Sequence, residues 1–253
     1  MEIKSVSENS YARVGGLTKA AIIAIWIAAF LNVAEVVLNE YIWTPSIWRA
    51  VDTIQMILLA SYTILTLLSS WANFKASKLK VKDAIDNAFG TEIGDEHSTN
   101  YYDNEEVIEG AKKLLYNTAE SCFFSHRELQ KMKIGMCIKA LIPLFVLCIG
   151  LIIESTAVIR MVLQLSAILV LLVRVIKFYC TISQLNNLLD RMFVTLKHKN
   201  VSDSQLHAES INYTIEYEAL MVWYGTKIPD KIYHKMNKQL TSEWERMRKS
   251  FVI

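Results

Sequence analysis

Four long stretches of the chain are apolar around almost their full circumference, and they dominate its pattern of hydrophobic and polar positions. They cover residues 17–38, 47–72, 134–153 and 158–183. A helix needs about 20 predominantly apolar residues to cross a bilayer, and each stretch supplies them. Their polar stripes are too narrow to be the solvent face of a soluble helix. The pattern therefore predicts an all-α integral membrane protein with four transmembrane helices, in preference to four buried helices of a soluble core.

The polar segments between these stretches divide the chain into five parts. Residues 1–16 form an N-terminal segment, 17–72 a first transmembrane hairpin, 73–133 a helical loop, 134–183 a second transmembrane hairpin and 184–253 a helical tail. Helical spacing in the loop and the tail predicts helices that continue from the spans and pack together as one layer. Asp103 and Glu106 have the spacing of a capping box, which predicts that a helix of the loop starts there.

Lysine and arginine are distributed unevenly over the polar segments. The loop 73–133 carries nine and the tail 184–253 carries ten, whereas the two short connections carry one each. The positive-inside rule then predicts a multi-pass membrane protein with the loop, the tail and both termini in the cytoplasm. The first apolar stretch has 22 residues, which is longer than the apolar core of about 7–15 residues in a cleaved signal peptide. We therefore expect it to be retained as an anchor.

Composition and motifs exclude several classes of function. A net charge of +2 does not suit a binder of nucleic-acid duplexes, and 3 prolines and 8 glycines do not suit a disordered chain. The four cysteines have no paired spacing and are expected to be small apolar residues in a reducing compartment. The chain contains no nucleotide-binding, zinc-protease or serine-hydrolase motif, and its five histidines are dispersed. We therefore expect no enzyme activity, no metal and no cofactor.

Polar side chains nevertheless occur at membrane depth with helical spacing. The stripe residues are Asn32 and Glu35 in the first span, Asp52, Gln55, Tyr62, Thr66 and Ser69 in the second, and Gln164, Arg174 and Lys177 in the fourth. One interpretation is structural, because hydroxyls bond back to their own helix and long cations reach the interface. The other is that several chains bring these stripes together around an aqueous lumen. Four helices are too few to enclose a wide channel, so a pore implies a homo-oligomer.

The layout and three local motifs resemble the SMODS-associated four-transmembrane effector family of bacterial antiphage defence. The first motif runs from Lys75 through Asp86 to Phe89-Gly90. The second runs from Ser98 to Asn104 and is followed by Leu114, Asn117 and Glu120. The third is the tail stretch from Tyr213 to Met247, which contains the element from Lys227 to Tyr233 followed by Glu243 or Glu245. The resemblance implies a pore-forming effector that is encoded beside a sensor or a nucleotide-signal synthase and breaches the inner membrane during infection.

A signal-gated pore needs a contact surface for its trigger, which would be a cyclic oligonucleotide or a partner protein of the defence system. Cations and aromatic rings are the groups that bind an anionic nucleotide. The candidates are Tyr101, Tyr102, Lys112, Lys113, Arg127 and Lys131 in the loop, and Trp223, Tyr224, Lys227, Asp230 and Tyr233 in the tail. Alternatively, the lysines form a solvated helix face and the aromatic rings pack in a core.

Three hypotheses about function follow. The first is a signal-gated homo-oligomeric pore that depolarises the bacterial membrane. The second is a non-conducting membrane scaffold or sensor that recruits a cytoplasmic partner; it predicts that the polar stripes can be replaced by apolar residues without loss. The third is a transporter or a lipid-modifying enzyme. It is disfavoured because the two hairpins show no internal repeat and no paired His or Asp lies at the interface.

Overall fold

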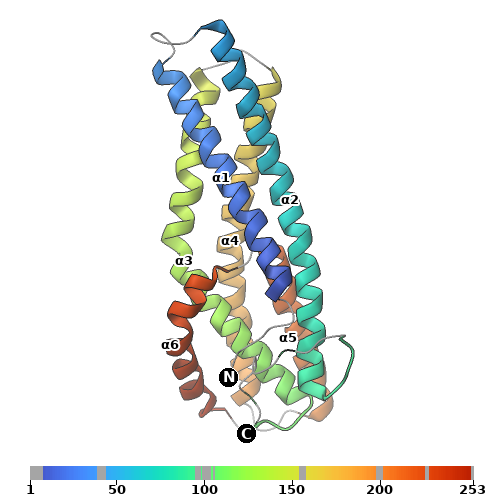
Figure 1. The fold of residues 1–253 in the computed structure, drawn as a ribbon. Coiled ribbons are helices and arrows are strands. Elements are labelled where there is room, and N and C mark those ends of the chain that lie inside the picture. The colour runs from blue at the N-terminus through green and yellow to red at the C-terminus, as the bar shows by residue number, and fades with distance from the viewer. Residues whose placement is uncertain are drawn as a thin grey trace.

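The computed structural model is an elongated bundle of helices (Figure 1). It describes residues 8–38, 44–94, 98, 104, 106–153, 158–197, 202–225 and 228–251. Its elements are α1 Glu8–Leu38, α2 Pro45–Phe89, α3 Ala111–Ile153, α4 Val158–Lys197, α5 Asp203–Tyr224 and α6 Asp230–Arg248. No strand occurs in the described ranges, and four of the helices are long and apolar enough to cross a membrane. The predicted fold class and the multi-pass membrane character are confirmed.

Three helices are much longer than a bilayer is thick. The 45 residues of α2, the 43 of α3 and the 40 of α4 extend to about 60–70 Å at 1.5 Å per residue, against a hydrocarbon core of about 30 Å. Each therefore crosses the membrane with only part of its length. We call residues 17–72 and 134–183 the apolar half of the molecule, and the described parts of 73–133 and 184–251 the polar half.

The two halves have separate cores. In the apolar half, α1 packs most extensively on α2, and small side chains such as Ala21 and Ala28 let the helices approach closely around Leu59 and Leu171. In the polar half, α5 packs on α2, α3 and α4, and α6 lies against α3 (Figure 1). Trp244 of α6, which is 1% exposed, packs into that second core. The described parts of the loop and the tail thus form a helical bundle built on the continuations of the spans.

Local signals explain where several helices begin and end. Pro45 occupies the first turn of α2, where its missing N–H is not needed. Gly90 ends α2 and Gly225 ends α5, both in the left-handed conformation that glycine adopts without strain. The Ser202 hydroxyl caps α5 by accepting a hydrogen bond from the Gln205 N–H at 3.3 Å.

The predicted start of the loop helix is wrong. Residues 106–110 form turns and a bend, and α3 begins only at Ala111. Gly110 has φ of 127°, a conformation outside the helical region, and its N–H donates to the Ala88 carbonyl at the end of α2. Asp103 lies outside the described residues. A contact to α2, which is distant in sequence, therefore decides where α3 starts.

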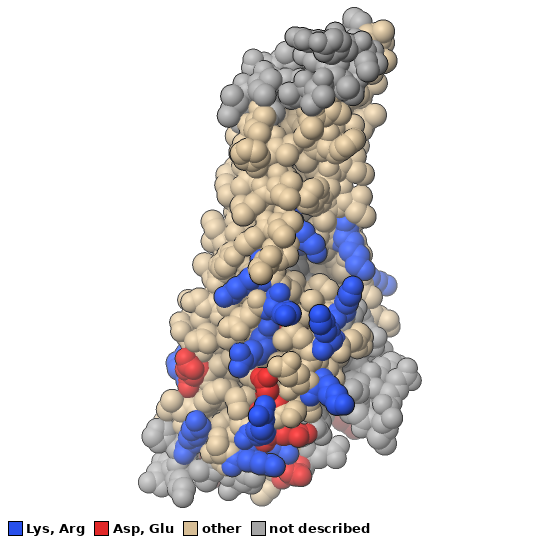
Figure 2. Space-filling model, turned by 90° about the vertical axis from the view of Figure 1, so that its left-hand side faces the viewer, with Lys and Arg blue, Asp and Glu red and all other residues tan. Residues whose placement is uncertain are grey.

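The surface of the apolar half is the surface expected of a protein in lipid. Large aliphatic and aromatic side chains are exposed on all four helices, among them Phe30, Ile57, Leu67, Phe145 and Leu169. Figure 2 shows that the upper part of the face seen there carries neither acidic nor basic atoms, whereas both signs occur further down. An exposed apolar surface of this extent is expected to lie in contact with lipid.

Candidate functional site

A cluster of three amides lies inside the apolar half and joins three helices. The Gln55 amide of α2 donates to the side-chain oxygen of Asn32 on α1 at 3.5 Å, and the Gln164 amide of α4 donates to the same oxygen at 3.4 Å. All three side chains are 1% exposed. The Gln55 side-chain oxygen accepts no hydrogen bond from the described residues. The structure thus brings three predicted stripe residues together within one chain.

The stripe on α2 continues toward the polar half as a row of hydroxyls. Thr18 of α1 and Ser69 of α2 share a hydrogen bond of 2.8 Å, and Ser69 also donates to the Val14 carbonyl at 3.4 Å. Thr66 bonds back to the Tyr62 carbonyl at 2.8 Å. These contacts are the ones that the structural interpretation of the stripes expects.

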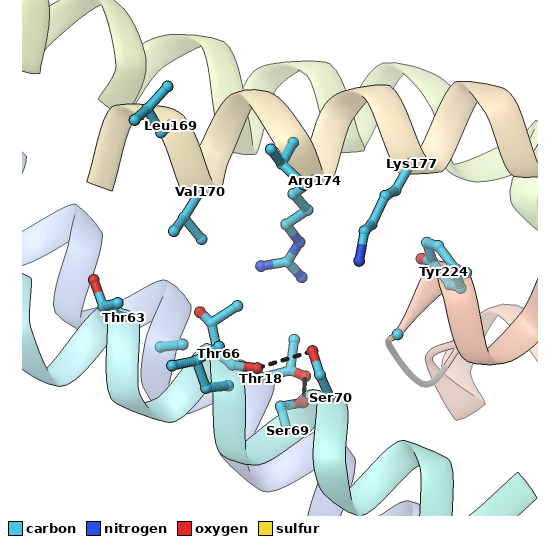
Figure 3. A pocket seen from close by; sticks show the side chains of 14 residues that line it. Thr18, Thr63, Thr66, Ser69, Ser70, Leu169, Val170, Arg174, Lys177 and Tyr224 are labelled. Atoms are coloured by element: carbon cyan, nitrogen blue, oxygen red, sulfur yellow. Dashed lines mark hydrogen bonds between the residues drawn. The ribbon is translucent and has the colours of Figure 1, made fainter. Parts of the chain in front are cut away.

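Two cations of α4 lie near the end of the apolar half and project into a cavity of about 260 Å³ between α2 and α4. Figure 3 shows Arg174 and Lys177 reaching from α4 toward the hydroxyl-bearing side of α2. The Lys177 ammonium lies 4.5 Å from the centre of the Trp223 ring, a cation–π contact. The Arg174 Nε has no hydrogen-bond partner among the described residues. No described carboxylate lines this cavity, and within the described part of the chain hydroxyl groups and the Trp223 ring lie nearest to the two positive charges.

The stripe residues therefore face the inside of the bundle in a single chain. Gln55, Tyr62, Ser69 and Gln164 are buried, and Thr66, Arg174 and Lys177 are half-buried at the cavities. Asp52 is half-buried near the N-terminal end of α2. Glu35 belongs to α1, but its side chain lies outside the described set. Whether these residues line a pore in an oligomer stays a prediction.

The predicted signal contacts are spread over several places. Lys112 and Lys113 lie in the first turn of α3 and are half-buried. Arg127 stands over the Phe123 ring and pairs with Glu243 of α6 at 3.8 Å, while Lys131, one turn further on, is exposed. Trp223 is exposed and Tyr224 buried at the end of α5, and Tyr233 of α6 borders a small cavity of about 100 Å³. Tyr101, Tyr102 and Lys227, and the side chain of Asp230, fall outside the described residues.

Part of the second motif is a buried hydrogen-bond network. Asn104 donates to Asn117 at 2.9 Å and to the Glu120 carboxylate at 2.7 Å, and Asn117 donates to Asn87 of α2 at 2.8 Å. In the first motif, Asp86 accepts bonds from the backbone N–H groups of residues 93 and 94 at 2.7 Å each. These side chains fix the described residues 93, 94 and 104 between α2 and α3, which is a structural role.

A charged cluster that the sequence analysis did not single out joins α2, α3 and α5 in the polar half. The Ser77 hydroxyl donates to Glu218 at 2.7 Å, and Lys80 pairs with the other Glu218 oxygen at 3.6 Å and donates to the Tyr217 hydroxyl at 3.1 Å. Ser125 of α3 lies 3.0 Å from the Tyr217 hydroxyl. Helical spacing of Tyr213, Tyr217 and Glu218 was the available signal, but the partners of Tyr217 and Glu218 are more than 90 residues away in sequence.

One further acid of this region is buried below the membrane-spanning part of α3. Glu128 is 5% exposed, and one of its carboxylate oxygens has no hydrogen-bond partner among the described residues. Burial raises the pKa of Glu128 from 4.5 to about 7, and the positive charge of Lys80 opposes this shift. Glu128 is therefore partly protonated near neutral pH.

Comparison of the chain with protein-family models, with curated proteins and with solved structures finds no match.

Proposed function

We propose that the protein is a signal-gated, homo-oligomeric pore-forming effector of the bacterial inner membrane, and that the bundle is its closed state. The polar half and both termini lie in the cytoplasm, because the loop and the tail carry most of the lysines and arginines. Opening depolarises the membrane of an infected cell, and the likeness of the three motifs to antiphage effectors supports that role. The activating signal is a cyclic oligonucleotide or a partner protein that contacts the polar half.

The observation that carries this proposal is the inward placement of polar groups that a plain anchor does not need. A charge at the bilayer centre costs about 2.5–3.5 kcal/mol on insertion scales. Here Asn32, Gln55 and Gln164 are buried within the spans, and Arg174 and Lys177 border a cavity that no described carboxylate lines. Sequestering these groups inside each chain keeps a resting cell intact. In the open oligomer, the helix faces that carry these groups would turn toward neighbouring chains and surround a water-filled lumen.

The continuous helices provide a physical route for gating. α2, α3 and α4 each run without interruption from the polar half into the apolar half, so a rotation imposed at one end reaches the other. A signal opens the pore only if it binds the open arrangement more tightly than the closed one. Because α5 contacts all three of these helices, a signal bound in the polar half could favour the open arrangement of all three.

Inducible expression in bacteria with a membrane-potential dye tests the proposal. Wild type is compared with the double variant Gln55→Leu/Arg174→Leu at matched membrane levels, alone and with candidate triggers. The matched control is Gln184→Leu/Arg246→Leu, which makes the same chemical changes at exposed positions of the polar half. We expect depolarisation by wild type and by the control but not by the double variant. If no trigger produces depolarisation in any of the three, the non-conducting scaffold is the better hypothesis and capture of its partner follows.

A further inference from the structure

A larger cavity of about 780 Å³ lies where the two halves of the molecule meet. It is enclosed by α1, α3 and α4, by the end of α5 and by the start of α6, and it shares Thr18, Arg174 and Tyr224 with the smaller cavity of Figure 3. Its inner wall is partly apolar, with Ile25 and Leu171. The cavity thus combines aliphatic walls with a position at the edge of the membrane-spanning part.

The charge of this cavity has one sign. Lys19 of α1, Lys131 and Lys139 of α3, Arg174 of α4 and Lys231 of α6 line it, and no acidic residue does so within the described part of the chain. The four lysines are exposed, and none of them makes an ion pair with a described carboxylate. Figure 2 shows basic atoms gathered directly beneath the uncharged upper part of that face, above the acidic ones. Positive side chains from four helices at the membrane boundary attract an anion.

The inner end of the cavity holds a buried donor that no described residue satisfies. Tyr62 is 0% exposed and lines the wall, and its hydroxyl makes no hydrogen bond to the described residues. Arg174 and Thr66 are the described side chains that act on this hydroxyl, and neither makes a hydrogen bond of normal geometry to it. Burying a hydroxyl without a hydrogen-bond partner is unfavourable. An anion oxygen between Tyr62 and Arg174 would accept from both groups.

We propose that this cavity binds the phosphate headgroup of an anionic phospholipid from the leaflet next to the polar half. Lysine and arginine side chains bind phosphate by charge-assisted hydrogen bonds. The aliphatic wall and the location at the membrane edge suit a ligand whose phosphate carries acyl chains, and basic pockets between spans bind such headgroups. Because the lipid would touch α1, α3, α4 and α6 together, it stabilises the arrangement of the two halves. The assignment holds whether or not the protein conducts ions.

Thermal unfolding of the full-length protein in a neutral detergent measures this binding. The probes are dioctanoyl phosphatidylglycerol, dioctanoyl phosphatidylcholine, inorganic phosphate and glycerol phosphate. The site variant is Lys19→Gln/Lys131→Gln/Lys139→Gln, which spares Arg174. The matched control removes three other exposed lysines, Lys197→Gln/Lys235→Gln/Lys238→Gln. Tyr62→Phe removes only the buried hydroxyl. Unfolding of each variant without lipid checks that it is folded.

We expect phosphatidylglycerol, and not phosphatidylcholine, to raise the Tm of wild type and of the control. At about 1 kcal/mol for each of the three lysines, the site variant should bind phosphatidylglycerol roughly 100-fold more weakly. Tyr62→Phe should weaken it by a smaller factor. Equal effects of the two lipids, or equal binding by site and control variants, would overturn the proposal. Stabilisation by inorganic phosphate or glycerol phosphate with none by phosphatidylglycerol would overturn the lipid as the source of the anion.

Discussion

The Ser77 hydroxyl on α2 donates to the Glu218 carboxylate on α5 at 2.7 Å, although 141 residues separate them in the chain. Both side chains are buried, and Lys80 completes the contact from the same face of α2. This pair lies just beyond the membrane-spanning part of α2. It ties the tail to the helix that carries the polar stripe, so the state of the polar half and the position of α2 are physically linked.

Removing the Glu218 charge should destabilise the polar half. Glu218→Gln removes the ion pair between Glu218 and Lys80 in a site where the two side chains are 9% and 13% exposed. Breaking one side of a buried pair costs about 3 kcal/mol, so we expect a clear fall in Tm in detergent. Glu216→Gln on the same helix is the control, because Glu216 pairs with the exposed Arg191 and such surface pairs contribute at most about 1 kcal/mol. Equal effects of the two variants would contradict a special role of the Ser77–Glu218–Lys80 contact.

The raised pKa of Glu128 predicts a pH-dependent stability. Between pH about 4.5 and 7 the native state retains a proton that the unfolded chain releases, so the free energy of unfolding falls as pH rises through this window. The shift corresponds to about 3 kcal/mol. Glu128→Gln should therefore be more stable than wild type at pH 8 by up to that amount and should lose this advantage at pH 4.5. Unfolding at several pH values measures it, and the exposed Glu245→Gln should follow wild type throughout.

The amide cluster predicts non-additive effects on stability. Asn32→Leu removes the oxygen that accepts from Gln55 and Gln164 and should cost about 1–2 kcal/mol, the range of such bonds between membrane helices. Replacing all three residues of the amide cluster by leucine removes all of its polar groups and should restore stability toward wild type. Thermal unfolding in detergent checks both variants, with Ile57→Leu on the exposed surface as the control. A triple variant that is less stable than Asn32→Leu would show that packing, not hydrogen bonding, dominates at this position.

The two glycines Gly90 and Gly16 should respond oppositely to alanine. Gly90 has φ of 62°, and a Cβ there would lie 2.9 Å from a carboxylate oxygen of Glu109. Gly90→Ala should cost about 1–2 kcal/mol for the left-handed conformation, somewhat more if the Glu109 side chain cannot move away. Gly16 lies within α1 with nothing within 4 Å of an added Cβ, so Gly16→Ala should be neutral or stabilise the protein by up to about 1 kcal/mol. Differential unfolding of the two variants is the measurement.

The sequence by itself determined the helices and the spans. The four apolar stretches appear in the structure as the long apolar helices that their pattern predicts. Pro45 and the glycines at positions 90 and 225 lie at helix ends, where they act through local backbone preferences. The polar stripes were also identifiable, because helical spacing alone places Gln55, Tyr62 and Ser69 on one face.

Only the tertiary structure decided what those faces meet. Asn32 joins Gln55 to Gln164, Ser77 reaches Glu218, and Gly110 with its bond to Ala88 delays the start of α3. The five cations of the larger cavity come from four helices, and their convergence depends on how α6 folds back beside α1 and α3. Such pairings depend on packing between segments that are distant in sequence, whereas helical spacing acts over a few residues.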